Sequence, residues 1–182
     1  MATKTSYSSA KFMLEIEGKP VGFLSSVDGG ELFAAVVHEP IDTSGVVRKS
    51  VGAIGFSPIC ISFGAGMSNS LYQWMADVLN RKGSGKSGAI VFCDYNYAER
   101  SRLEFDNAAI VKVAFPALDA TGAKGDARFT LTLQPEAARI SSASIGKSIP
   151  VFGNKKQIAL SCNFRLKITG LEIGRASCRE RV

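Results

Sequence analysis

The stretch RKGSGKSGAI, residues 81–90, contains residue types that can hold a nucleotide phosphate. Gly85-Lys86-Ser87 matches the end of a P-loop, G-x-x-x-x-G-K-[ST], in which backbone amides at the start of a helix cradle the phosphates. The first glycine of that pattern is here Asn80. The residues before the motif have helical periodicity and those after it have strand character, so an anion would meet the negative end of a helix dipole. The sequence therefore predicts a flexible, basic helix-to-strand loop at this point.

A second group of candidate residues lies in the run FCDYNYAERSRLEF, residues 92–105. Paired carboxylates in this run could carry out acid–base chemistry. Alternation along a hairpin instead favours a solvated, ion-paired face. Tyr95 and Tyr97 near basic residues could stack on nucleic-acid bases, and this alternative stays open. The charged members of the run are Asp94, Glu99, Arg100, Arg102 and Glu104.

The remaining chemically competent residues are one histidine and four cysteines. His38 has no G-x-S-x-G or nucleophilic cysteine motif beside it, which favours a structural or surface role at the end of a strand. The cysteines have no CxxC spacing, so a zinc site is not expected. Cys60 and Cys93 lie in strand-like segments and are expected to be reduced, buried thiols. The sequence predicts no catalytic, cofactor-binding or metal-binding residue; the other two cysteines are Cys162 and Cys178.

The elements that must position these residues belong to a β-rich globular chain. The 182 residues are 46% hydrophobic and 21% charged, with a formal net charge of +6, a composition that permits a buried core. The polar N-terminus predicts no signal peptide, and no apolar run approaches the roughly 18 to 20 residues that a membrane span needs.

Periodicity predicts about eight or nine strands and one helix. Phe12, Leu14 and Ile16 alternate with polar residues and Met13, and residues 129–133 alternate in the same way. A single apolar stripe predicts a helix over about residues 68–80, formed by Leu71, Trp74, Met75, Val78 and Leu79. The predicted fold is mainly β, an antiparallel β-sandwich or barrel with one packed helix. Residues 41–58 are expected to project as an extended hairpin or loop.

Four segments are predicted along the chain. Residues 1–140 form the β domain, and residues 141–160 are a Ser-, Gly- and Lys-rich linker. Residues 161–171 begin a second copy of the domain, because NFRLKITG at 163–170 repeats KFMLEIEG at 11–18 with one constant offset of 152 residues. Residues 172–182, EIGRASCRERV, have the sequence of a translated sequencing adapter and are excluded from fold reasoning.

Several blocks, taken in order, resemble the tail tube protein family of contractile-tailed phages and contractile injection systems. FMLEIEGKPVGFLSSVDG is similar to the family's first hairpin, and VRKSVGAIGFSPICISFGAGMSNSLYQWMADVL to its strand, turn and tryptophan-centred helix. AIVFCDYNYAERSRLEFDNAAIVKVAFPALDA and ARFTLTLQPEAARI are similar to the following blocks. The resemblance covers about residues 8–140.

The resemblance implies a structural subunit, not an enzyme, that forms stacked hexameric rings in a virion tail or a cytoplasmic injection particle. It implies as partners other copies of the chain and sheath, baseplate or tape-measure proteins, with DNA or cargo as candidate contents of the lumen. Assembly then falls to the 41–58 extension and the 94–106 hairpin, whose exposed edges would pair with a neighbouring subunit. A monomeric β-rich module that binds nucleic acid or a ligand remains the alternative.

Overall fold

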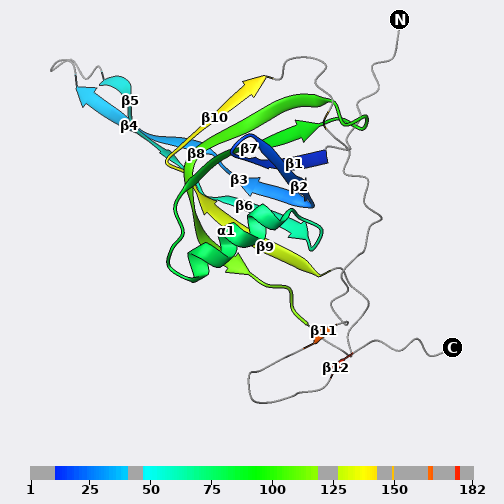
Figure 1. Ribbon diagram of the computed structural model, residues 1–182. Coiled ribbons are helices and arrows are strands. Elements are labelled where there is room, and N and C mark those ends of the chain that lie inside the picture. Colours follow the sequence, from blue (N-terminus) through cyan, green and yellow to red (C-terminus); the bar gives the residue numbers. More distant parts are fainter. Residues whose placement is uncertain are drawn as a thin grey trace, which may run out of the picture.

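The chain folds around antiparallel strands and one helix in the computed structural model (Figure 1). The structure describes residues 11–40, 47–118, 127–142, 149, 164–165 and 175–176. The elements are β1 (Lys11–Ile16), β2 (Lys19–Leu24), β3 (Ser26–Gly29), β4 (Leu32–Pro40), β5 (Val47–Phe56), β6 (Ile59–Gly64), α1 (Asn69–Leu79), β7 (Lys86–Cys93), β8 (Glu99–Ala114), β9 (Arg128–Gln134), β10 (Ala137–Ser142), β11 (Phe164–Arg165) and β12 (Arg175–Ala176).

Eight strands form one curled antiparallel sheet in the order β2-β1-β7-β8-β9-β6-β3, with β10 also paired to β8. The 16-residue strand β8 makes the curl, because its first half pairs with β7 and β10 and its second half with β9. The two ends of the path, β2 and β3, are separated only by Ser25, whose N–H donates to the Ser62 carbonyl over 2.7 Å. The mainly β antiparallel prediction is confirmed, although the described strands do not form a closed barrel.

The first hairpin is shaped by its two-residue turn. Glu17 and Gly18 have φ of 51° and 73°, the combination that joins twisted antiparallel strands with least strain. Gly18 adopts this conformation without steric cost. The turn aligns β1 with β2 and leaves the other edge of β1 to pair with β7.

The helix α1 contributes its apolar stripe to the main core. Ser68 is its N-cap residue, and the backbone N–H of the C-cap residue Asn80 donates to Ala76. Leu71, Trp74 and Met75 are buried with side chains from both halves of the sheet. The sequence predicts that Leu79 shares this stripe, but it is 61% exposed because it lies in the last turn, beyond the edge of the core.

The strand β1 is buried on both faces, which alternation alone does not predict. Leu14 enters the main core, whereas Met13, expected on the polar face, is fully buried in a second cluster with Val91 and Cys93. Ile149 covers this cluster and is itself only 4% exposed. A residue from the predicted linker therefore makes the second face of β1 a packing surface.

The C-terminal predictions are only partly within the described residues. Ser141 and Ser142, placed at the start of the linker, are the last two residues of β10. Phe164 and Arg165 pair with Arg175 and Ala176 in a two-residue ladder. The rest of the predicted second repeat and of the adapter-like tail lies outside the described residues, so the proposed organisation of that region remains a proposal.

Candidate assembly surface

The P-loop-like motif is used for packing between α1, β7 and β8. The helix precedes the motif and β7 follows it, as the sequence predicts. The loop is shorter than expected, because Lys86 and Ser87 already belong to β7. A Cβ atom at Gly85 would clash with Asn107 Oδ1, and Ser87 Oγ accepts a hydrogen bond from the Asn107 N–H over 3.0 Å. The glycine and the serine of the motif are thus both engaged by the strand β8.

The loop is also fastened to the helix. Trp74 Nε1 donates to the Ser84 carbonyl over 3.0 Å, and Lys86 Nζ lies 3.5 Å from Glu17 Oε1. The lysine of the motif therefore points toward the β1–β2 turn and an acidic side chain. This geometry fits a structural loop, because the three motif residues are committed to contacts within the subunit.

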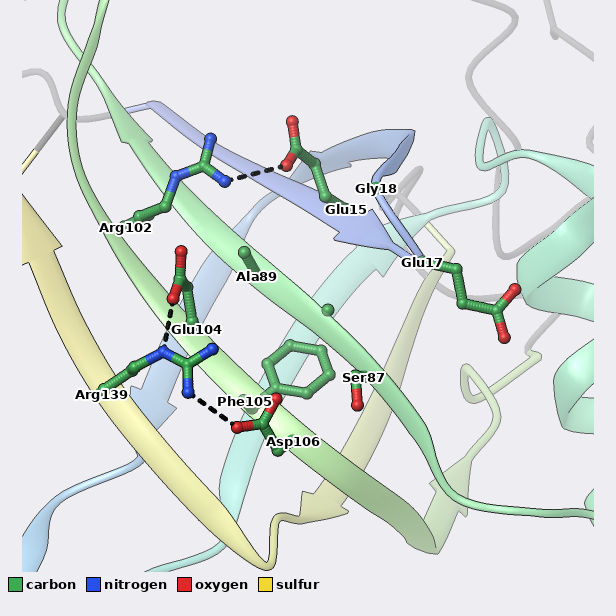
Figure 2. Close-up of a pocket in the computed structure, with 11 residues that line it drawn as sticks. Glu15, Glu17, Gly18, Ser87, Ala89, Arg102, Glu104, Phe105, Asp106 and Arg139 are labelled. Carbon is green, nitrogen blue, oxygen red and sulfur yellow. Dashed lines mark hydrogen bonds and ion pairs between the residues drawn. The ribbon is translucent and has the colours of Figure 1, made fainter. Parts of the chain in front are cut away.

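The charged residues of β1, β8 and β10 line a shallow hollow of about 240 Å³. Figure 2 shows Arg102 reaching toward Glu15, and Arg139 placed between Glu104 and Asp106. Arg139 Nε is 2.6 Å from Glu104 Oε2, and its Nη1 is 3.0 Å from Asp106 Oδ2. These carboxylates face guanidinium groups, so the hollow is a ladder of cross-strand ion pairs.

Arg102 is the centre of the more buried half of this ladder. It makes a bidentate pair with Glu99, with Nε–Oε1 and Nη2–Oε2 distances of 2.5 and 2.8 Å, and its Nη1 lies 3.5 Å from Glu15 Oε2. Glu99 is 4% exposed, and a buried carboxylate needs such a partner to stay charged. The predicted ion pairing of this run is confirmed for these residues, but the predicted solvated face is not, because Glu99 is buried.

Asp94 organises the tight turn between β7 and β8. Its Oδ1 accepts hydrogen bonds from the N–H groups of Asn96 and Ala98 over 2.8 and 2.9 Å. Its Oδ2 accepts two hydrogen bonds from Arg100, the shorter of 2.7 Å. The Ala98 N–H, followed by the Arg100 side chain, lowers the pKa of Asp94 below its ordinary value. The turn is therefore built around an ionised aspartate, but the hairpin expected over residues 94–106 is instead formed by β7 and β8, because residues 99–106 belong to a single strand.

The two tyrosines of this turn differ in what their rings contact. Lys11 Nζ lies 3.6 Å from the centre of the Tyr97 ring, and the Phe23 ring meets Tyr97 edge-on at 5.4 Å. Tyr97 is therefore packed against its own subunit. Tyr95 is 68% exposed and has Lys11 5.2 Å from its ring centre. Of these two tyrosines, Tyr95 alone has a ring exposed enough to stack on a nucleic-acid base.

The strands β4 and β5 form a two-stranded arm that projects from the sheet (Figure 1). We refer to residues 32–40 and 47–56 together as the arm. At its base, the Ser57 N–H donates to the Glu31 carbonyl over 2.9 Å, and the Gly30 N–H donates to Pro58. His38 is exposed on the arm and lies opposite Lys49, which confirms its surface position. The expectation that residues 41–58 project is confirmed for residues 47–56, which pair with β4 and not with each other, while residues 41–46 lie outside the described residues.

One face of the arm is a ladder of exposed apolar side chains. Leu32 lies opposite Phe56, Ala34 opposite Ile54, and Val36 opposite Val51, with a bulge between the last two pairs. Residues directly opposite one another share a face. The exposed fractions on this face are 60% for Leu32, 57% for Val36, 72% for Val51 and 57% for Ile54. An apolar ladder of this kind is the signature of a surface that another protein covers.

A second group of exposed apolar side chains lies at the other end of the ladder formed by β6, β9 and β8. The arm leads into β6 at Ile59, which pairs with Leu133 of β9, and Leu133 in turn pairs with Ile110 of β8. The second group follows the opposite end of β8. Its members are Phe115 and Leu118, each more than half exposed, whereas the exposed Val111 follows Ile110 at the arm end of the ladder. Two separate apolar surfaces, the arm and this β8-end patch, therefore lie at opposite ends of the subunit.

Comparison with solved structures identifies the architecture. The cap that terminates the tube of the anti-feeding prophage superposes with a TM-score of 0.65 at 19% identity, covering 79% of this chain and 95% of that one. The fold is that of a contractile-injection-system tube or cap protein. The PVC sheath/tube terminator gives 0.63 at 17% identity, covering 78% of this chain and 100% of that one. A chain of the extended PVC sheath–tube complex gives 0.62 at 16%, covering 78% and 95%.

Sequence comparisons give no further assignment. No protein-family model matches the chain, and no curated protein matches it. At identities below 20% the likeness establishes the fold, and the role of this chain has to be argued from its own surfaces. Among the described residues, no helix is long and apolar enough to cross a membrane, and no cluster of His, Cys, Asp and Glu could hold a metal ion.

Sequence reasoning misses the β8-end patch and the cover over Met13. Phe115 and Leu118 follow an apolar run, and a run of that kind is typical of core. Periodicity does not separate them from core residues, because both lie just after Ala114, the last residue of β8 that pairs with β9. The 94–106 region is expected from the sequence to join the assembly surface, but its charges are largely paired within the subunit.

Proposed function

We propose that this protein is a structural subunit of the tube of a contractile injection system or phage tail, and that it assembles into stacked hexameric rings. The observation that carries the proposal is the arm, whose exposed apolar ladder has no cover within the described part of the subunit. A two-stranded ribbon is marginal in water on its own. Contact with a neighbouring copy would bury the ladder and stabilise the ribbon.

The partner that fits the arm is another copy of the same chain. The arm and the β8-end patch are different surfaces at opposite ends of the subunit. Such a pair supports head-to-tail contact, in which the arm of one copy covers the patch of the next. Contacts of this type close into a ring when the rotation between neighbours divides a full turn. The shared fold of tube and cap proteins supports a ring of this kind.

Sheath, baseplate and tape-measure proteins are proposed as the outer and end partners. The comparison structures include a sheath–tube complex and a baseplate, so chains of this fold occur in both settings. We place the protein in a virion tail or an assembled injection particle on the same ground. No catalytic role is proposed, because the candidate acid–base residues are held in ion pairs.

The test is a double substitution on the arm, Val36→Lys with Val51→Lys. These side chains lie opposite each other and are 57% and 72% exposed, so the subunit should remain folded. Losing their burial should raise the concentration needed for ring formation by about a hundredfold or more, at roughly 1.5 kcal/mol or more per side chain. Sedimentation velocity and negative-stain electron microscopy would measure the assembly.

Leu79→Lys is the matched control, because Leu79 is 61% exposed on α1, away from the arm. We expect this variant to form rings like the wild type, and circular dichroism to show all three proteins folded. A wild-type chain that stays monomeric at high concentration would contradict the proposal. An arm variant that still forms rings would contradict the assigned surface.

A further inference from the structure

The second apolar cluster lies on the face of β1 and β7 that points away from the main core. Met13 and Val91 are directly paired on neighbouring strands, and both are fully buried. Cys93 lies two residues further along β7 on the same face and is 3% exposed. We call these three residues the β1–β7 strip. A strand buried on both faces requires a cover on each, and the helix and sheet of the main core cover only one.

The cover on this face is the side chain of Ile149. Ile149 is 4% exposed and packs with the strip, and Phe23 of β2 packs beside it. The backbone N–H of Ile149 donates to the Tyr97 carbonyl over 3.1 Å. Ile149 is thus held by its apolar side chain and by one backbone hydrogen bond at the turn between β7 and β8.

The chain is long enough for Ile149 to reach the β1–β7 strip from the end of β10. Ser142, the last residue of β10, lies opposite Ser101, at the end of β8 nearest that turn. Strands β8 and β7 follow β10 in order, so the strip is about 10 Å away across the sheet. The seven residues that follow Ser142, up to and including Ile149, can span more than about 20 Å when extended.

We propose that the β1–β7 strip is an intramolecular docking site whose occupant is Ile149 of the same chain, and that this contact shields the Cys93 thiol from solvent. The inference does not depend on ring assembly, since every contact that supports it lies within one subunit.

The buried thiol of Cys93 provides a direct readout of this contact. Burial, followed by the charges of Glu99, Asp94 and Glu15, raises the pKa of Cys93 to about 11. The thiolate is the reactive form, so the covered thiol should react slowly with alkylating reagents. Removing the cover restores solvent to the sulfur and lowers the pKa toward its ordinary value.

The experiment measures the alkylation rate of Cys93 in the folded full chain by N-ethylmaleimide labelling, digestion and mass spectrometry. Ile149→Asn should raise that rate by about tenfold or more, because exposure of the sulfur removes the largest cause of its raised pKa while the charges of Glu99, Asp94 and Glu15 remain. Ile140→Asn is the matched control, because Ile140 is 80% exposed on β10, and the Cys93 rate in this variant should stay within about twofold of the wild type.

Cys60, which lies in β6 and is half-buried where the sequence predicts a buried thiol, is the internal reference. Global unfolding would raise the rates of Cys60 and Cys93 together. If both rates rise in the first variant, Ile149→Ala is measured in its place. The proposal then requires that Ile149→Ala raise the alkylation rate of Cys93 and leave that of Cys60 unchanged. An unchanged Cys93 rate in a folded Ile149 variant would overturn the proposal. Protection of Cys93 that disappears on dilution would also overturn it, because the cover would then come from another copy.

Discussion

At the scale of single residues, the side chains that resemble catalytic groups are the ones that hold the strand ends in place. Asp94 is the clearest case, because its two oxygens accept hydrogen bonds from two backbone N–H groups and from Arg100. A carboxylate with these partners is committed to fixing a turn. The same applies to Glu99, which is held in a bidentate pair with Arg102.

The first prediction concerns the pH dependence of this turn. Because hydrogen bonds lower the pKa of Asp94 in the folded state, its contribution to stability is present above the unfolded pKa of about 3.9 and is lost as the pH falls through the folded value. Asp94→Ala should therefore lower the melting temperature at pH 7, and the difference from the wild type should shrink below about pH 4.

Asp28→Ala is the control for this measurement, since Asp28 is an exposed aspartate on β3. Thermal melts followed by circular dichroism between pH 3 and 7 would compare the three proteins. A gap between Asp94→Ala and the wild type that is constant across this pH range would show that the carboxylate charge does not stabilise the turn.

At the scale of elements, sequence periodicity identifies the pieces that have one buried face. The stripe containing Leu71 and Trp74 predicts the helix correctly, because three of its five apolar side chains are buried and only the end of the stripe emerges. The helix-then-strand order around Gly85 is also predictable from periodicity, and that order by itself argues against phosphate binding.

Periodicity fails where burial depends on a distant segment. Met13 alternates with Leu14 and is therefore expected to face solvent, yet it is fully buried by packing with Ile149, 136 residues away in sequence. For the apolar residues of the arm the prediction is wrong in the opposite sense, because they are expected to be buried and are exposed. Val36 and Val51 are residue types typical of a core, but their strands leave the sheet and pair only with each other.

The second prediction tests how strongly α1 is attached through its central tryptophan. Trp74 is 1% exposed and donates its indole N–H to Ser84. Trp74→Ala should destabilise the chain by about 3–5 kcal/mol, the range for removing a buried large aromatic side chain. Leu79→Ala, at a position that is 61% exposed on the same helix, should change stability by no more than about 0.5 kcal/mol.

Urea unfolding followed by tryptophan fluorescence and circular dichroism would measure both effects, with circular dichroism alone for the variant that lacks the only tryptophan. Equal losses for the two variants would mean that the helix is held along its whole length. A small loss for Trp74→Ala would mean that the helix packs independently of its stripe.

At the scale of the whole molecule, the C-terminal ladder bears on the proposed second copy of the domain. Phe164 pairs with Ala176 and Arg165 with Arg175, while Phe12 pairs with Leu24 and Met13 with Phe23. Each partner is displaced by the same 152 residues that relate the two sequence matches. Since residues 172–182 are expected to be adapter-derived, this pairing gives no independent support to a second domain, which rests on the sequence repeat alone.

The last prediction follows from counting domains in a ring. If the gene continues after Leu171 into a second tube-like domain, two neighbouring positions of a six-domain ring are filled by one chain. A closed ring then needs three copies of the natural chain, whereas residues 1–152, which retain Ile149, should need six. Sequencing of the gene by a method without the adapter would supply the natural chain, and native mass spectrometry would count its copies. Six copies of a two-domain chain in one ring would contradict the equivalence of the two domains, and an unrelated sequence after Leu171 would remove the second domain itself.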